Sequence, residues 1–242
     1  ASEDGKSALF SMIRAAVEIK RMDLANQGFE QVMKEDPPGQ PAKKYSADQF
    51  VRIGQWMLEG GQFKNAIASF EKVMGSGSDD RAVLERTLYG LGQSYYAVTN
   101  LEKSVQTLDD LLTRYPKSGL FFDAKMLMCK ALNESGKPAD AIAPLSDVMK
   151  FAPDALLQTR ASMELGRIQM SMAKKFRAEN KEKEATDSQR SALASYERVA
   201  LLGDEKNKDI APMIEEALLR SIELYTEIQR FDDAVGACDR YE

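Results

Sequence analysis

One spacing pattern recurs along the sequence and constrains the fold more than any other feature. A small residue is followed four positions later by a large side chain, and an apolar residue usually stands three positions after that. This spacing places all three side chains on one face of a helix. The pattern occurs six times, as the sets Ala25/Phe29/Val32, Ala66/Phe70/Val73, Ser104/Leu108/Leu111, Ala141/Leu145/Val148, Ala192/Tyr196/Val199 and Ala234/Cys238/Tyr241.

A second helical segment, with an apolar stripe of its own, precedes most of these sets. Turn-forming residues separate the two segments and also separate one pair from the next. Each repeat is therefore predicted to be a helix pair, with its internal turn near residues 21, 61, 100, 137, 180 and 230. The sequence predicts an all-α chain without a sheet, as a single domain over 1–242. Its repeats are expected at about 6–38, 46–78, 84–117, 121–154, 158–205 and 214–242.

The second and third repeats carry the most specific residues. They contain Ile53-Gly54, Gly61, Ala66 and Phe70, and then Leu91-Gly92-x-x-Tyr95, Ser104-x-x-x-Leu108 and Pro116. These residues resemble the tetratricopeptide repeat, in which a glycine lets neighbouring helices approach closely and large apolar residues fill the space between pairs. The resemblance implies a right-handed α-α superhelix of about six helix pairs that binds other proteins in its concave groove.

The spacing between successive sets departs from that family. It runs 41, 38, 37, 51 and 42 residues, against about 34 in the standard repeat. The longest interval contains the polar segment 170–191, which we expect to extend both helices of the fifth repeat by about two turns each. The resulting charged hairpin is either a docking arm or a solvated extension. Pro144 lies inside another predicted helix, where we expect a kink.

One linker carries a further resemblance. The residues Arg114-Tyr115-Pro116-Lys117-Ser118, followed by Asp123-Ala124, resemble the Y-P-x-S linker of bacterial periplasmic and outer-membrane repeat proteins. Examples of that group are the lipoprotein subunits of β-barrel assembly machines and the Tol-Pal coordinator. The resemblance implies a location in the bacterial cell envelope, in the periplasm, in preference to the cytoplasm.

The composition argues against several classes of function. Histidine is absent, which removes the usual general base near neutral pH and the commonest metal ligand. The net charge of −5 comes from 33 basic and 38 acidic residues in a mixed distribution. Nucleic acid is therefore not expected as a partner, because phosphate binding needs a concentrated positive face. No apolar run is long enough to predict a membrane span.

The cysteines and the acidic pairs do not predict a catalytic or metal site. Cys129 takes the small position of a first helix and Cys238 the large position of a second helix, so both are expected to be buried packing residues. Adjacent carboxylates such as Asp79 and Asp80 diverge by about 100° on a helix and do not converge on one metal ion. We therefore expect no enzymatic activity, no cofactor and no metal.

The candidate site is the groove face of the first helices in the third to fifth repeats. Tyrosines and methionines give rigid or adaptable apolar contact there, and polar side chains orient a partner. The residues expected on this face are Tyr89, Gln93, Tyr96, Met126, Lys130, Asn133, Met163, Arg167 and Met170. The expected occupant is a partner protein or peptide. An ordinary solvated face is the alternative, because single exposed apolar residues are common.

Two broader interpretations of the chain stay open. It is a protein-interaction scaffold, or else an accessory or regulatory region of a larger enzyme, or a sensor whose groove binds a small ligand or signal peptide. The sixth repeat is truncated, and an uncapped apolar face there would meet water. More chain, a partner, or self-association through that repeat is expected to cover it.

Overall fold

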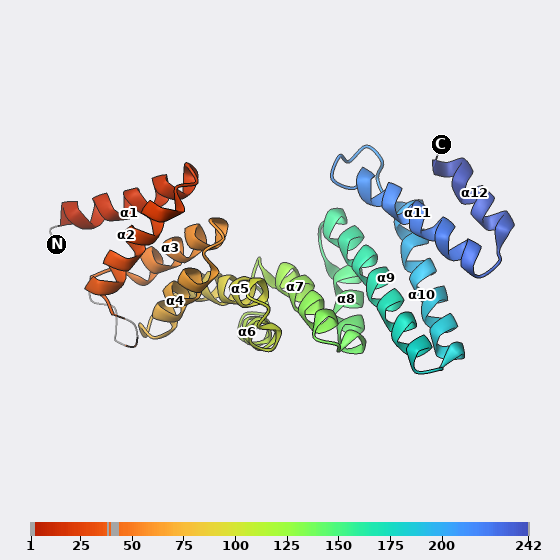
Figure 1. Ribbon diagram of the computed structural model, residues 1–242, viewed down its shortest axis with the longest axis horizontal. Helices are drawn as coiled ribbons and strands as arrows, with labels where there is room; N and C mark the ends of the chain where they lie inside the picture. Colours follow the sequence, from red (N-terminus) through yellow and green to blue (C-terminus); the bar gives the residue numbers. More distant parts are fainter. Residues whose placement is uncertain (1–2, 38, 40–43, 242) are drawn as a thin grey trace. The chain divides into compact units, whose positions relative to one another are not determined.

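Twelve α-helices follow one another in the computed structural model, which describes residues 3–37, 39 and 44–241 (Figure 1). No strand occurs within these residues, so the all-α prediction is confirmed. The helices are α1 (Glu3–Glu18), α2 (Met22–Glu35), α3 (Ala47–Glu59), α4 (Phe63–Met74), α5 (Arg81–Ala97), α6 (Leu101–Arg114), α7 (Phe121–Glu134), α8 (Pro138–Phe151), α9 (Ala155–Ala178), α10 (Glu182–Leu202), α11 (Ala211–Glu227) and α12 (Phe231–Tyr241). Their order matches the six predicted helix pairs.

A residue in the left-handed conformation stands at each of the six predicted turns. These residues are Lys20 (φ 59°), Gly61 (71°), Thr99 (58°), Gly136 (80°), Asn180 (57°) and Gln229 (61°). In each case the next backbone N–H donates to a carbonyl five positions back, as from Gln62 to Met57 at 2.7 Å. This is the Schellman arrangement, which satisfies carbonyls left free at a helix C-terminus. The predicted turn positions are confirmed.

The chain divides into two units, and the boundary falls inside α7. The N-terminal unit is Ala1–Leu127 and the C-terminal unit is Met128–Glu242. In the first, α1 packs on α2, α3 on α4 and α5 on α6, and α5 also packs on α4. In the second, α9 packs on α8 and α10, and α11 packs on α10 and α12. This stacking of each pair on the next is typical of helical repeats. The single domain over 1–242 stays a prediction.

The ring of Phe70, on α4, lies between two glycines. A Cβ atom placed on Gly54 of α3 would come within 2.7 Å of this ring, and one on Gly90 of α5 within 2.3 Å. The next pair repeats the contact, since a Cβ on Gly92 would lie 2.5 Å from Leu108. Only a residue without a Cβ fits at such distances. Close approach of the helices at glycine, inferred from the sequence, is therefore present in the structure.

The two cysteines have different environments. Cys129 is fully buried on α7, and its thiol lies 3.6 Å from the carbonyl oxygen of Ala141. Its predicted packing role is confirmed. Cys238 on α12 is exposed, so the prediction that it is buried is wrong. The large position of a second helix is covered by the following first helix, as α5 covers Phe70, and no described helix follows α12.

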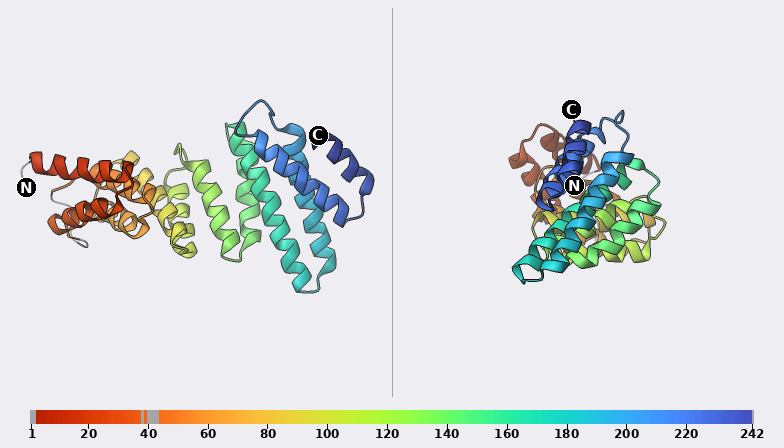
Figure 2. Two further views of the ribbon diagram at one scale, coloured as in Figure 1. Left: turned by 45° about the horizontal axis from the view of Figure 1, so that its top comes forward. Right: turned by 90° about the vertical axis from the view of Figure 1, so that its right-hand side faces the viewer.

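The fifth pair is extended, as predicted. α9 has 24 residues and α10 has 21, whereas α6 and α8 have 14 each. Figures 1 and 2 show α9 and α10 running side by side to a shared tip. Ala173 and Ala185 are both fully buried in this extension. Small side chains therefore let the two helices stay in close contact beyond the neighbouring pairs.

Pro144 lies inside α8, which continues as one helix from Pro138 to Phe151. Proline has no backbone N–H, so the carbonyl of Asp140 lacks the helical hydrogen bond that it would receive from residue 144. The kink expected from this missing bond stays a prediction.

Candidate partner-binding site

The nine predicted groove residues divide between the two units, so each group is considered by itself. Four belong to the N-terminal unit and five to the C-terminal unit. The first group is Tyr89, Gln93, Tyr96 and Met126, and the second is Lys130, Asn133, Met163, Arg167 and Met170.

Tyr89 and Gln93 line a cavity of about 560 Å³ between α3 and α5, which we call the α3–α5 hollow. The residues around it are Gln55, Leu58, Glu59, Arg86, Tyr89, Gly90, Gln93 and Leu120. The contribution of α3 was not predicted. A signal for it exists in the repeat, because Gln55 directly follows Gly54 as Gln93 directly follows Gly92.

The α3–α5 hollow combines a fixed cation with a protonated phenol. The guanidinium of Arg86 donates to Asp48 Oδ1 at 2.8 Å, and this hydrogen bond lowers the pKa of the Asp48 carboxyl. Burial raises the pKa of Tyr89, and the nearby charge of Asp123 adds to this effect. The phenol of Tyr89 therefore stays protonated at neutral pH and is available as a hydrogen-bond donor.

Tyr96 and Met126 do not line the α3–α5 hollow. Tyr96 is partly buried at the end of α5. Met126, on α7, is only 8% exposed, so its predicted role as an accessible contact is wrong. A methionine side chain is unbranched and flexible, and it fills apolar gaps readily.

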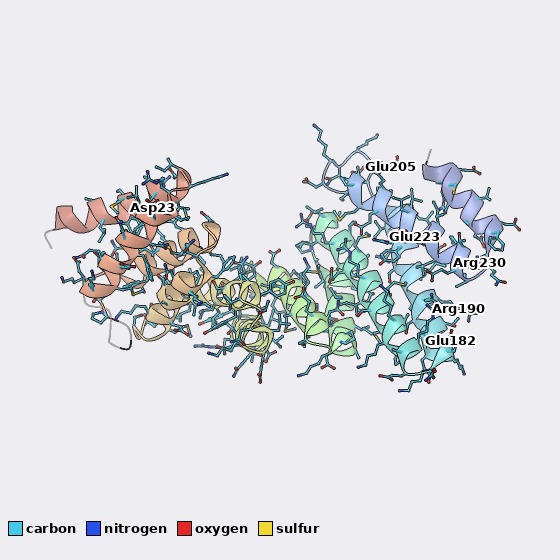
Figure 3. All side chains as sticks on the ribbon, viewed as in Figure 1. Asp23, Glu182, Arg190, Glu205, Glu223 and Arg230 are labelled. Carbon is cyan, nitrogen blue, oxygen red and sulfur yellow. The ribbon has the colours of Figure 1, made fainter. Side chains whose placement is uncertain are left out.

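Arg167 and Met170 line a second cavity, of about 340 Å³, in the C-terminal unit. We call it the α9–α11 hollow, and Figure 3 labels Glu223 on its α11 side. The residues around it are Arg167, Met170, Ser171, Lys174, Tyr196, Glu216, Arg220, Glu223, Leu224 and Glu227. Three are cationic and three are anionic, so the lining has no net charge.

The other predicted residues of the C-terminal unit lie outside this hollow. Met163 is 1% exposed and packs in the core with Tyr196 and Leu218, so its predicted role as a partner contact is wrong. Lys130 is exposed and Asn133 is partly buried on α7. The Oδ1 atom of Asn133 is buried and has no hydrogen-bond partner among the residues that the structure describes.

Arg167 is held by carboxylates on two helices. Its Nη2 atom donates to both carboxylate oxygens of Glu216 on α11, at 3.0 and 2.9 Å, and its Nη1 atom donates to Glu164 at 3.4 Å. Burial lowers the pKa of Arg167, but these carboxylates outweigh it and the pKa is raised overall. The bidentate pair joins α9 to α11. Arg167 therefore has a structural role at the wall of the hollow.

The extended hairpin supplies part of the same wall. Ser171 and Lys174 belong to the segment that lengthens α9, and both line the α9–α11 hollow. Further along, Arg177 donates to Gln189 at 2.8 Å, and Gln189 donates to Glu227 of α11 at 2.6 Å. The extension is thus tied to α11 through a buried glutamine. The side chains from 177 to 184 are all exposed, as expected of a solvated extension, and a docking arm stays a prediction.

The part of the chain that the structure describes has neither a metal-binding cluster nor a membrane-spanning helix. It contains no group of three or more acidic or cysteine side chains able to hold a metal ion. None of its helices is long and apolar enough to cross a membrane.

Comparisons with known proteins match one repeat in the sequence and the fold of the chain. Residues 86–118, which span most of α5 and α6, match the tetratricopeptide repeat family (TPR_6). No curated protein matches the sequence.

Among solved structures, the apo form of RapI is similar over 96% of this chain, with a TM-score of 0.66 and 12% sequence identity. The chain covers 63% of that protein. A crystal structure of MamA protein is similar over 82% of this chain and 97% of its own, with a TM-score of 0.52 and 16% identity. At these identities the likeness concerns the fold. The chain therefore has an all-α repeat fold of stacked helix pairs, with a match to the tetratricopeptide repeat at residues 86–118.

Proposed function

We propose that the protein is a non-enzymatic interaction scaffold that binds a partner protein or peptide on the first helices of its repeats. One observation carries this proposal: a hollow opens on first helices in each unit, at matching repeat positions. Gln93 and Arg167 each directly follow the close-packed glycine of their helix, at Gly92 and Gly166, and each lines its hollow. A surface that recurs with the repeat is suited to an extended partner.

The two hollows offer different chemistry to such a partner. In the α3–α5 hollow, the half-buried ring and hydroxyl of Tyr89 stand beside the carboxamide of Gln93. Tyrosine combines a large rigid contact area with a polar end, and it is enriched among residues that dominate binding energy. In the α9–α11 hollow, balanced charges such as Lys174 and Glu216 favour a partner with matching polar groups over one of high net charge.

A small ligand is a second candidate occupant of the α9–α11 hollow. Its volume of about 340 Å³ lies at the lower end of the range of about 300–1,000 Å³ that is typical of small-molecule sites. Fractionation of a cell extract into small molecules and proteins, followed by a thermal shift measurement with each fraction, separates the two occupants.

The compartment is part of the same proposal. We assign the protein to the bacterial cell envelope on the resemblance of the linker Arg114–Ser118. Antibody detection in periplasmic and cytoplasmic fractions of the native cells tests this assignment.

The binding role is tested by affinity capture followed by titration. The wild-type chain captures proteins from native extract, and each captured protein is titrated against wild type, Tyr89→Ala and Gln93→Ala. Tyr89 and Gln93 line the α3–α5 hollow, so both variants are expected to weaken binding while keeping the wild-type melting temperature. Equal binding by both variants and wild type would remove this hollow from the proposal.

A further inference from the structure

A larger cavity in the N-terminal unit lies between the second helices α2 and α4. Its volume is about 750 Å³, and we call it the α2–α4 cleft. The side chains of Phe29, Met33 and Phe63 line it, with Val98 from the end of α5. None of the residues of this cleft lines the α3–α5 hollow. The cleft is therefore a separate surface with an apolar component.

A chain of side-chain amides runs along the same cleft. Asn65 Nδ2 donates to Asn26 Oδ1 at 2.8 Å, and Asn26 Nδ2 donates to Gln62 Oε1 at 3.1 Å. All three side chains are partly buried and line the cleft. Because each amide donates in the same direction, the oxygen of Asn65 is left as a free acceptor within the described residues. Each of the two asparagines also keeps a second N–H for another partner.

The charge at the edge of the cleft is positive. Lys34 and Lys64 line it and are exposed, and neither forms an ion pair within the described part of the chain. Glu30 is the acidic residue of the lining. Two unpaired ammonium groups beside one carboxylate favour an anionic group on whatever occupies the cleft.

We propose that the α2–α4 cleft binds an extended peptide segment that carries a large apolar side chain next to acidic residues. An extended peptide has unpaired backbone N–H and C=O groups, whereas a helix satisfies most of its own. The amides of Asn26 and Asn65 can pair with such a backbone. The apolar side chain lies against Phe29, Met33 and Phe63, and the acidic group lies near the lysines. This binding surface is independent of the partner proposed for the first helices.

The test uses NMR of the full chain with a synthetic probe. The probe is an acetylated and amidated octapeptide of glycine and serine that contains one phenylalanine followed by two aspartates. One matched peptide has alanine in place of phenylalanine, and another has lysines in place of the aspartates. We expect saturable shifts of the side-chain amide signals of Asn26, Gln62 and Asn65 with the first peptide. Both matched peptides are expected to bind at least fivefold more weakly.

Substitutions test whether the peptide binds in the α2–α4 cleft. Asn65→Ala is expected to lower the affinity for the first peptide about fivefold, because it removes one hydrogen-bonding side chain. If Asn65→Ala has a lowered melting temperature, Asn65→Ser is used in its place. Lys34→Gln with Lys64→Gln is expected to weaken binding and to reduce its dependence on salt. Gln27→Ala is the matched control, for which unchanged affinity is expected, because Gln27 is exposed on α2 and lines neither the cleft nor the α3–α5 hollow.

Three results would overturn the proposal. One is the absence of a saturable shift at millimolar peptide. Another is equal affinity for the peptide without phenylalanine or for the lysine peptide. The third is a loss of affinity in Gln27→Ala that matches the loss in Asn65→Ala, because Gln27 lies outside the cleft lining. None of these results bears on the partner captured through Tyr89, so the two proposals fail separately.

Discussion

The hydroxyl of Tyr95 on α5 donates a hydrogen bond of 2.8 Å to the carboxylate of Glu71 on α4. The same bond recurs between the last two pairs of the series, where Tyr225 on α11 donates to Glu197 on α10. In both cases the tyrosine of a first helix is joined to the second helix of the preceding pair. The bond therefore links one repeat to the next.

Because the Tyr95 phenol must keep its proton to make this bond, we expect the stability of the fold to fall at alkaline pH. The pKa of Tyr95 is raised from 10.0 to about 12. Burial is the larger cause, and the hydrogen bond to Glu71 is the second. A pKa raised in the folded state gives stability that is fully present below the unfolded pKa and is lost as the pH rises through the folded one. The stabilisation by Tyr95 is therefore expected at pH 8 and should decline between pH 10 and 12.

Urea unfolding of wild type and Tyr95→Phe measures this effect. At pH 8 we expect the variant to be less stable by about 1 kcal/mol, the usual contribution of one hydrogen bond. The difference should shrink as the pH rises above 10. A difference that stays constant up to the onset of alkaline unfolding would contradict the role of the phenol proton. Glu71→Gln with Tyr95→Phe gives the coupling between the two side chains.

Glycine is required on both sides of Phe70, because a Cβ at Gly90 would overlap the ring. Gly90→Ala should lower the free energy of unfolding by about 1–3 kcal/mol, the usual cost of overpacking. Gly236→Ala is the matched control in α12, where nothing lies within 4 Å of an added Cβ. It should be neutral or stabilise by up to about 1 kcal/mol, because alanine is the better helix former. Equal effects in thermal unfolding would rule out steric contact as the reason for Gly90.

Thr99 has a left-handed backbone (φ 58°), which a β-branched residue rarely adopts. Thr99→Gly should raise the free energy of unfolding by about 1 kcal/mol, because glycine has no Cβ to clash in this conformation. The reverse change at an equivalent turn, Gly61→Ala, should lower it by about the same amount. Unfolding in urea measures both, and a less stable Thr99→Gly would show that the side chain of Thr99 contributes more than its backbone costs.

Burial separates two of the residues predicted for the groove. Met163 is 1% exposed, so Met163→Ala should destabilise the fold by about 2–5 kcal/mol. Tyr89 is half-buried at the edge of its hollow, so Tyr89→Ala should change stability less and partner affinity more. Melting curves and titration with the captured partner measure the two quantities. A larger loss of stability in Tyr89→Ala than in Met163→Ala would place Tyr89 in the core.

The sequence by itself determined the repeats, because their signals are local. Helical spacing, and glycine or polar residues at turns such as Gly61 and Asn180, act within a few residues of one another. The close approach at Gly54 and Gly92 was likewise predictable, since the repeat pattern places a glycine opposite a large side chain. The six turns and the lengthened fifth pair follow from these signals.

The tertiary structure alone decided which side chains are accessible. Met163 and Arg167 differ by four positions on one helix face, yet Met163 is in the core and Arg167 is exposed and held by Glu216. Cys238 is exposed because burial at its position depends on a following helix. The amide chain joins Asn26 to Asn65 across 39 residues. Such contacts depend on how neighbouring helices pack, and the spacing of residues within one helix carries no information about the helix that packs against it.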